Sequence, residues 1–191
     1  QAHGEGKNIV FFLDSAIGHF DVFRVDELLA DKEFPAVTGK NDSLYWMPYM
    51  DSLSVFSTKN KFKMYTSARH DGRLTVSNNG LTGGGNFYYD IATMHSQNYD
   101  FKHHEMRSPS LDIDLYDSLL DDYYIRATDH KGYMNFEEDR GNFVANGNAQ
   151  PLEFPINMFK TFSKEFDWIV KEKQLIFKYE DPYSLVDIPN T

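Results

Sequence analysis

The clearest structural signal in the chain is Gly72-Arg73-Leu74-Thr75-Val76-Ser77-Asn78-Asn79-Gly80-Leu81-Thr82-Gly83-Gly84-Gly85. Residues 73–77 alternate apolar and polar side chains with the period of two that is typical of a β-strand. The Asn-Asn-Gly that follows is a strong signal for a tight turn. The three consecutive glycines precede a second strand-like run and no Lys, Ser or Thr follows them. They therefore predict a turn or a β-bulge and not a phosphate-binding loop.

The same alternation recurs on both sides of this stretch. The further predicted strands lie at residues 20–25, 53–57, 62–65, 86–91, 99–102, 111–115, 124–127, 133–136 and 142–145. From residue 72 onward the starts lie roughly 8–13 residues apart, a spacing typical of all-β sandwiches and solenoids. Several runs place charges between apolar residues, which indicates a sheet with one buried face and one solvated face.

Helical signal is sparse. Residues 26–32 are long enough for a short helix before a break, and residues 115–121 are either a second short helix or a loop tip. Residues 158–172 are ambiguous, because their aromatic residues fit a helical stripe while 166–170 also alternate. The short polar break at 171–173, followed by another alternating run, favours a closing hairpin there.

We therefore predict an all-β fold with few short helices, an elongated β-solenoid or OstA-like stacked sheet. An antiparallel β-sandwich or jelly roll is the alternative. Residues 1–191 are expected to form a single β-rich domain or repeat segment, more irregular over 1–70 and a regular strand array over 71–180. The segment between them lacks the Pro, Gly, Ser or charge runs of a linker. We expect the chain to be part of a longer protein.

Composition excludes several classes of function. The 191 residues carry a net charge of −10, which disfavours non-specific binding to nucleic acid because the summed field repels phosphate. The chain has no cysteine and therefore no disulfide framework or thiol nucleophile. Aromatic residues make up 16% of the chain, far too many for a disordered protein. A folded core of aromatic side chains is the simplest use for them.

The pattern of strands and turns also resembles a known family. Together with residues 72–85, the resemblance rests on Tyr99-Asp100-Phe101, on Asp139-Arg140-Gly141-Asn142-Phe143-Val144-Ala145-Asn146, and on residues 152–157 and 166–168. These stretches resemble segments of very large, β-rich exported proteins of gram-negative cell envelopes. Those proteins are similar to OstA/LptA-type open folds, in which stacked strands form a long V-shaped or solenoidal sheet. The resemblance implies an exported protein in the periplasm, associated with the outer membrane or at the cell surface, and implies no catalytic residue.

Aromatic clusters are candidates for binding carbohydrate. Sugar rings stack on aromatic faces through their apolar faces, and their hydroxyls form hydrogen bonds with neighbouring Asp and Asn side chains. The residues that could form such a platform are Tyr45, Trp46, Tyr49, Tyr88, Tyr89 and Trp168. The competing interpretation is that these side chains fill the core of a narrow sheet.

Acidic and histidine clusters are candidates for metal binding. Asp112, Asp114 and Asp117 could contribute oxygen ligands to calcium, although the spacing of an EF-hand is missing. The alternative is a solvated acidic loop. His95 and His103-His104-Glu105 lack the spacing of known catalytic zinc sites. No cofactor other than this calcium ion is expected.

The sequence leaves three hypotheses open. The first is a non-catalytic scaffold or conduit segment of a large cell-envelope protein, whose partners are the rest of its parent chain or other envelope proteins. The second is a β-sandwich that binds or acts on polysaccharide or lipid glycan through the Tyr and Trp clusters. The third is a calcium-stabilised adhesion module. Motifs for nucleophilic catalysis are missing, which argues against an enzyme.

Overall fold

The fold was derived from a computed structural model that describes residues 2–11, 16–25, 35–47, 52–147 and 151–178. The described residues contain fifteen β-strands and no helix. The strands are β1 (Ala2–Phe11), β2 (Ala16–Val25), β3 (Val37–Met47), β4 (Ser52–Phe56), β5 (Phe62–Met64), β6 (Ala68–Ser77), β7 (Gly80–Tyr89), β8 (Ala92–Phe101), β9 (Glu105–Asp117), β10 (Asp122–Asn135), β11 (Arg140–Ala145), β12 (Leu152–Phe154), β13 (Phe159–Thr161), β14 (Glu165–Ile169) and β15 (Gln174–Lys178).

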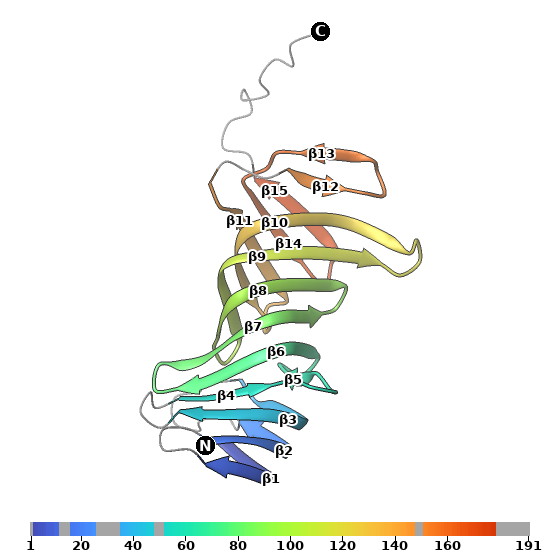
Figure 1. Cartoon of the computed structure of the whole chain (residues 1–191). Coiled ribbons are helices and arrows are strands. Elements are labelled where there is room, and N and C mark those ends of the chain that lie inside the picture. The colour runs from blue at the N-terminus through green and yellow to red at the C-terminus, as the bar shows by residue number, and fades with distance from the viewer. Residues whose placement is uncertain (1, 12–15, 26–34, 48–51, 148–150, 179–191) are drawn as a thin grey trace, which may run out of the picture.

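All fifteen strands belong to one open antiparallel sheet. Its main path runs β1-β2-β3-β4-β6-β7-β8-β9-β10-β11-β14-β15, so nearly every strand pairs with its neighbour in sequence. Figure 1 shows the result as a tall stack with β1 at one end and the last strands at the other. The predicted all-β, elongated stacked sheet is confirmed.

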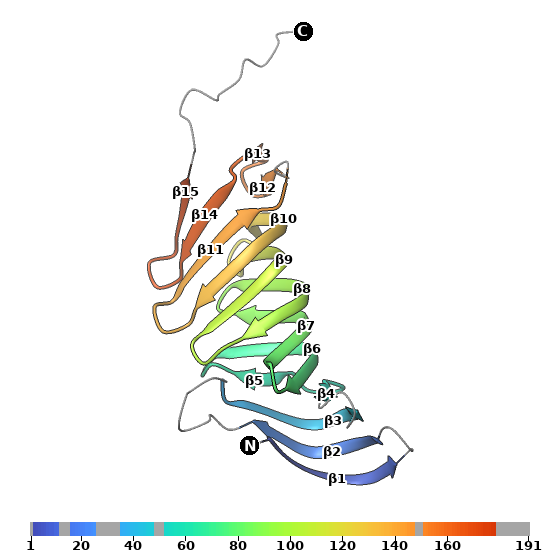
Figure 2. The ribbon, with the colours of Figure 1, turned by 90° about the vertical axis from the view of Figure 1, so that its left-hand side faces the viewer.

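Long strands change partner halfway along their length. β10 pairs with β11 over residues 130–135 and with β12 at Arg126. β3 likewise pairs with β4 over residues 43–47 and with β5 at residues 37–38. The partner of each long strand is therefore split into two short strands joined by a connection: β11 and β12 along β10, and β4 and β5 along β3. We call each such row of the stack a level. The sheet bends along this line, and Figure 2 shows the strands curving around the stack.

We call this line the bend; it is marked by Gly72, Gly85, Ser96, Ser108 and Asp129. Gly72 and Gly85 face each other across β6 and β7 and have φ angles of +146° and +128°. A Cβ on Gly72 would overlap the carbonyl oxygen of Gly84, and one on Gly85 would overlap that of Asp71. Only glycine fits both the backbone conformation and this close approach. The glycine run that the sequence marked as a bulge lies here, at a register shift between β7 and β8.

Hydroxyl groups continue the bend across the next strands. Ser96 Oγ and Ser108 Oγ form a hydrogen bond of 2.8 Å, in which either can be the donor. They lie 2.6 and 2.8 Å from the carbonyl oxygen of Ser110, which accepts the proton of the hydroxyl that does not donate to the other. Ser110 Oγ in turn donates to Asp129 Oδ1 at 2.7 Å. Ser96 and Ser108 are buried, so these bonds satisfy groups that would otherwise be stranded in the interior.

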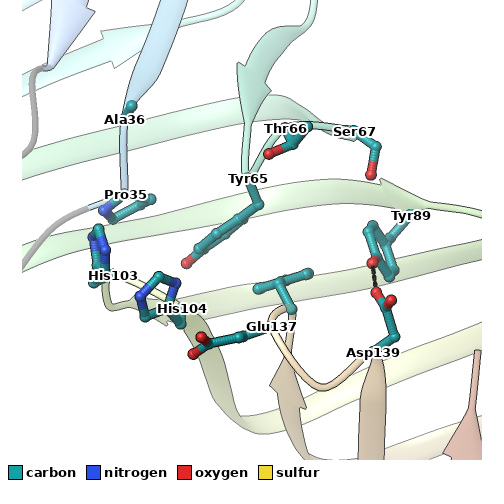
Figure 3. A pocket seen from close by; sticks show the side chains of 11 residues that line it. Pro35, Ala36, Tyr65, Thr66, Ser67, Tyr89, His103, His104, Glu137 and Asp139 are labelled. Atoms are coloured by element: carbon teal, nitrogen blue, oxygen red, sulfur yellow. Dashed lines mark hydrogen bonds between the residues drawn. The ribbon is translucent and has the colours of Figure 1, made fainter.

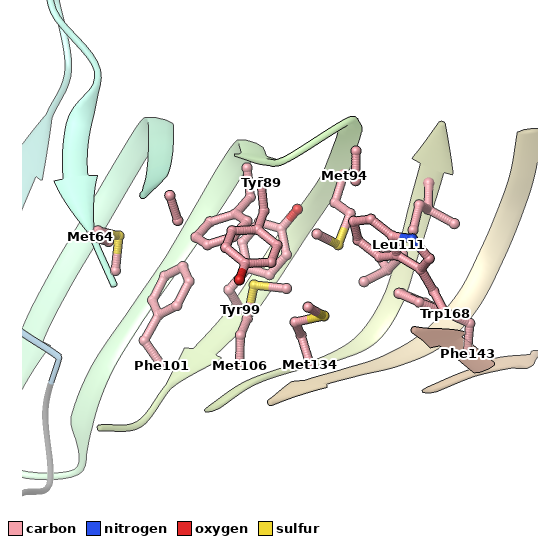
Figure 4. Close-up of a cluster of buried hydrophobic side chains, with 14 of the residues drawn as sticks. Met64, Tyr89, Met94, Tyr99, Phe101, Met106, Leu111, Met134, Phe143 and Trp168 are labelled. Atoms are coloured by element: carbon pink, nitrogen blue, oxygen red, sulfur yellow. The ribbon is translucent and has the colours of Figure 1, made fainter. Parts of the chain in front are cut away.

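The core fills the space between the two halves of the sheet. Figure 4 shows its side chains as a continuous row along the stack. The largest fully buried members are Phe62, Phe87, Tyr99, Phe101, Phe143, Phe166 and Trp168. Aromatic rings contact one another from level to level; Phe143 and Phe166, for example, stack with ring centroids 5.0 Å apart. Burial of this area is the main stabilising contribution to the fold.

Two details of the sequence prediction are settled by these strands, and a third cannot be compared with them. Residues 115–121 are not a helix, because β9 extends to Asp117 and residues 118–121 form the turn to β10. The closing hairpin predicted across the polar break at 171–173 is confirmed as β14 and β15, which pair from Glu165 with Lys178 to Ile169 with Gln174. The short helix predicted at 26–32 lies outside the described residues.

Candidate functional site

The two opposite ends of the strands meet along one side of the molecule. A straight ten-residue strand would separate its ends by about 33 Å. Tyr65, in the turn that precedes β6, nevertheless reaches the end of β8. Its hydroxyl lies 2.9 Å from the carbonyl oxygen of Lys102 and 2.8 Å from that of Glu105. Its ring stacks on Phe136, in the turn after β10, with centroids 3.8 Å apart.

A second cross-contact lies next to the first. The hydroxyl of Tyr89, at the end of β7, donates to a carboxylate oxygen of Asp139, in the turn before β11. Lys171 reaches the other oxygen of Asp139 at 2.9 Å. We call this line of contacts the seam, defined by Tyr65, Tyr89, Lys102, Phe136 and Asp139. The seam closes the folded sheet opposite the bend.

The electrostatics of the seam favour a charged carboxylate and neutral phenols. The hydrogen bond from Tyr89 and the nearby Lys171 hold the pKa of Asp139 below its ordinary value. Burial and the Asp139 carboxylate raise the pKa of Tyr89. Burial, helped by the charges of Asp100 and Glu105, raises the pKa of Tyr65 well above 10. Both phenols therefore stay protonated at neutral pH and act as hydrogen-bond donors.

A cavity of about 680 Å³ opens at the seam, and Figure 3 shows its side chains converging from several turns. It is lined by Pro35, Ala36, Tyr65, Thr66, Ser67, Tyr89, His103, His104, Phe136, Glu137 and Asp139. This volume lies in the range of sites that hold small molecules. Aromatic faces, hydroxyls, imidazoles and carboxylates together suit a polar ligand with one apolar face, such as a sugar.

Asp139 and Tyr89 suit hydrogen bonding to a ligand better than proton transfer. Asp139 is occupied by Tyr89 and Lys171, and its lowered pKa keeps it ionised, so it is a poor general acid near neutrality. The phenol of Tyr89 stays protonated because its pKa is raised, so it is a poor base.

The predicted sugar-stacking residues do not form one platform. Tyr88 and Tyr89 are adjacent on β7 and point to opposite faces of the sheet. Tyr88 lies under the ammonium of Lys61, 3.3 Å from its ring centroid, whereas Tyr89 lines the seam cavity. Trp168 is 1% exposed in the core. Of the remainder, Tyr45 is half-buried on β3, while the side chain of Trp46 and all of Tyr49 lie outside the described part.

The three predicted calcium ligands are also separated by the pleat of β9. Asp112 and Asp114 are on the outer face, where Asp112 accepts the backbone N–H of Asp129 and Asp114 pairs with Arg126 at 3.5 Å. Asp117 is on the inner face and accepts the backbone N–H groups of Leu119 and Leu120. Among the described residues, no group of three or more His, Asp or Glu side chains is placed to hold a metal ion.

The histidines divide in a similar way. His103 and His104 lie together in the turn between β8 and β9, with ring centroids 3.7 Å apart, and both line the seam cavity. His95 is exposed on β8 and bonds to Asn86 Oδ1 at 2.9 Å. Consecutive residues of a strand point to opposite faces, whereas this turn brings the two adjacent rings side by side.

Sequence reasoning missed the residues that close the seam. Tyr65 and Phe136 lie 71 positions apart in the numbering, in turns without a motif. The alternation assigned both to the ends of predicted strands, 62–65 and 133–136, whereas each lies in the turn that follows its strand. Their pairing depends on the sheet folding over, which strand periodicity does not encode.

Comparison with known proteins adds no relative. No family model, curated protein or solved structure matches the chain. No helix in the described part of the chain has the length and apolar character needed to cross a membrane.

Proposed function

We propose that the chain is a non-catalytic structural segment of a large exported protein of the gram-negative cell envelope, in which stacked β-levels form a scaffold. The observation that carries this proposal is the open sheet. Within the described residues, β1 pairs only with β2 and β15 only with β14. A sheet with an unpaired edge at each end can be extended by further strands of the same or another chain.

The packed interior favours a scaffold over a conduit. Between the halves of the sheet lie aromatic and methionine side chains that are almost completely buried, among them Phe87, Phe101, Met106 and Met134. A conduit would need this space for its cargo. The core instead makes each level a rigid spacer for the next.

Edge association tests the scaffold proposal. The segment should self-associate reversibly in sedimentation velocity experiments as its concentration rises toward about 1 mM, where a contact of about 4 kcal/mol is half saturated. Ile176→Lys places a charge on the edge strand β15, where Ile176 is 43% exposed, and should abolish association. Val22→Lys adds the same charge on β2 and should leave association unchanged. A strict monomer over this range, or equal effects of the two variants, would contradict the proposal.

A second function, glycan binding, is favoured by one specific observation. The seam cavity combines the rings of Tyr89 and Phe136 with the exposed carboxylate of Glu137. Calorimetric titration with a panel of neutral oligosaccharides tests it. Glu137→Gln should weaken binding about tenfold, since a charged hydrogen-bond partner is removed, while Glu138→Gln, which is outside the cavity, should not. Absence of binding across the panel would remove this function and leave the scaffold proposal untouched.

A further inference from the structure

The turn between β9 and β10 presents two leucines on a fixed backbone. Leu119 is 92% exposed and Leu120 is 60% exposed. Asp117 Oδ1 accepts the backbone N–H of Leu119 at 2.7 Å and that of Leu120 at 3.3 Å. The hydroxyl of Tyr116 donates to Asp121 in the same turn. The leucines are therefore held outward by the hydrogen bonds of the turn, which Figure 1 shows projecting beyond the turns next to it.

An apolar hollow of about 430 Å³ opens beside this turn. Leu115, Phe154 and Leu175 line it, and Trp168 contributes an edge from the core. The turn between β12 and β13 borders the hollow on another side. Asn157 of that turn lines the hollow, and the next residue, Met158, is 89% exposed. Exposed apolar side chains gathered around an apolar hollow mark an interaction surface.

The border of the hollow is acidic. Asp117 lines it, Asp121 follows in the turn, and Asp122 is the first residue of β10. Within the described part of the chain, neither Asp121 nor Asp122 takes part in an ion pair. Among the described residues that line the hollow, Lys173 is the one with a cationic side chain. Together with the net charge of −10, this border attracts positive charge.

We propose that this C-terminal hollow is a docking site for a protein segment that carries an apolar side chain flanked by Lys or Arg. The apolar side chain fills the hollow between the two turns, and Leu119 and Met158 cover it from the sides. The flanking cations face Asp121 and Asp122. A buried apolar anchor within a polar border is the usual arrangement of a protein-binding hot spot. The acidic border repels the head group of an anionic lipid, so charge complementarity selects a basic protein segment.

Peptide titration of the full chain tests the proposal. The ligands are two blocked peptides, Lys-Arg-Leu-Phe-Arg-Lys and its counterpart Glu-Glu-Leu-Phe-Glu-Glu. In a Trp46→Phe background, Trp168 is the sole tryptophan and its emission reports on the hollow. The basic peptide should give a saturable change in emission, with an affinity at least about tenfold higher than that of the acidic peptide. Calorimetry with the unmodified chain repeats the measurement and does not depend on the folding of the variant.

Matched variants locate the binding. Leu119→Ser should lower the affinity for the basic peptide about tenfold. Val22→Ser, which removes an exposed apolar residue from β2, should change that affinity less than about twofold. The double variant Asp121→Asn, Asp122→Asn should lower the affinity for the basic peptide by a similar factor, and should make that affinity less dependent on salt concentration. Asp100→Asn with Asp112→Asn removes two charges from residues that do not line the hollow and is the control. The proposal is overturned if calorimetry detects no binding, if both peptides bind equally, or if controls and test variants lose affinity alike.

Discussion

The bend and the seam fold the same sheet by different means. At the bend, backbone touches backbone: Gly72 and Gly85 approach so closely that no side chain fits, and Ser96 and Ser108 are bonded in the interior. At the seam, contact is made by the ends of side chains, chiefly the hydroxyl and ring of Tyr65 and the hydroxyl of Tyr89.

This difference suggests that the bend contributes mainly to stability and the spaces between the turns mainly to binding. A backbone contact has little freedom to adapt, so the bend fixes the shape of the sheet. A contact between side-chain ends leaves gaps between the turns, and both the seam cavity and the C-terminal hollow lie between turns. We therefore expect changes at the bend to reduce stability and changes between the turns to alter binding.

Gly72→Ala should have the largest effect. The added methyl group would overlap the carbonyl oxygen of Gly84, at a φ of +146° that residues with a side chain rarely adopt. Because backbone must move, we expect a loss of more than about 3 kcal/mol in the free energy of unfolding. Urea denaturation measures it. Gly147→Ala, at a positive φ but with open space around the Cβ, is the control and should cost far less.

Acid should lower the free energy of unfolding through His70, a buried residue of β6 close to Gly72 of the bend. Burial among aromatic rings lowers the pKa of His70 to about 4, against an ordinary value of 6.5. The folded state thus binds fewer protons, so this contribution is complete above pH 6.5 and is lost as the pH falls toward 4. Between pH 6.5 and 4.5 the loss is on the order of 2 kcal/mol. Denaturation across this range should show a shallower pH dependence in His70→Phe and an unchanged one in His95→Gln, which alters an exposed histidine.

Ser96→Ala should have an intermediate effect. It removes a buried hydroxyl that bonds to Ser108 and Ser110 and accepts the backbone N–H of Asn98. The stranded partners should cost about 1–2 kcal/mol in unfolding free energy. Ser118→Ala, in an exposed turn, provides the comparison. If the two substitutions cost the same, the hydroxyl bonds do not stabilise the bend.

Tyr89→Phe should have the smallest effect on stability. It keeps the ring in the core and removes only the hydroxyl that bonds to Asp139. We expect a loss of about 1 kcal/mol by thermal or urea unfolding. Asp139→Asn should show a similar loss, and the double variant should lose less than the sum of the two. Strict additivity would mean that the pair is not coupled across the seam.

The sequence predicted the strands better than their arrangement. The alternation over 73–77 and 142–145 marks β6 and β11 correctly, since it follows directly from which face is buried. Residues 99–102 and 111–115 were expected to be complete strands, yet they are halves of β8 and β9, because the bend interrupts the apolar pattern without ending the strand. The seam depends on contacts between distant turns, and strand periodicity contains no information about them.

Labels placed across the seam test the central claim, that the sheet folds over until the opposite ends of its strands meet. The chain has no cysteine, so Thr66→Cys and Glu137→Cys allow specific spin labelling of two exposed residues that line the same cavity. Pulsed electron paramagnetic resonance should give one narrow distance distribution, well below the roughly 33 Å spanned by a straight ten-residue strand. A distribution centred at or beyond that length would show that the sheet does not fold over at the bend, and would contradict the account.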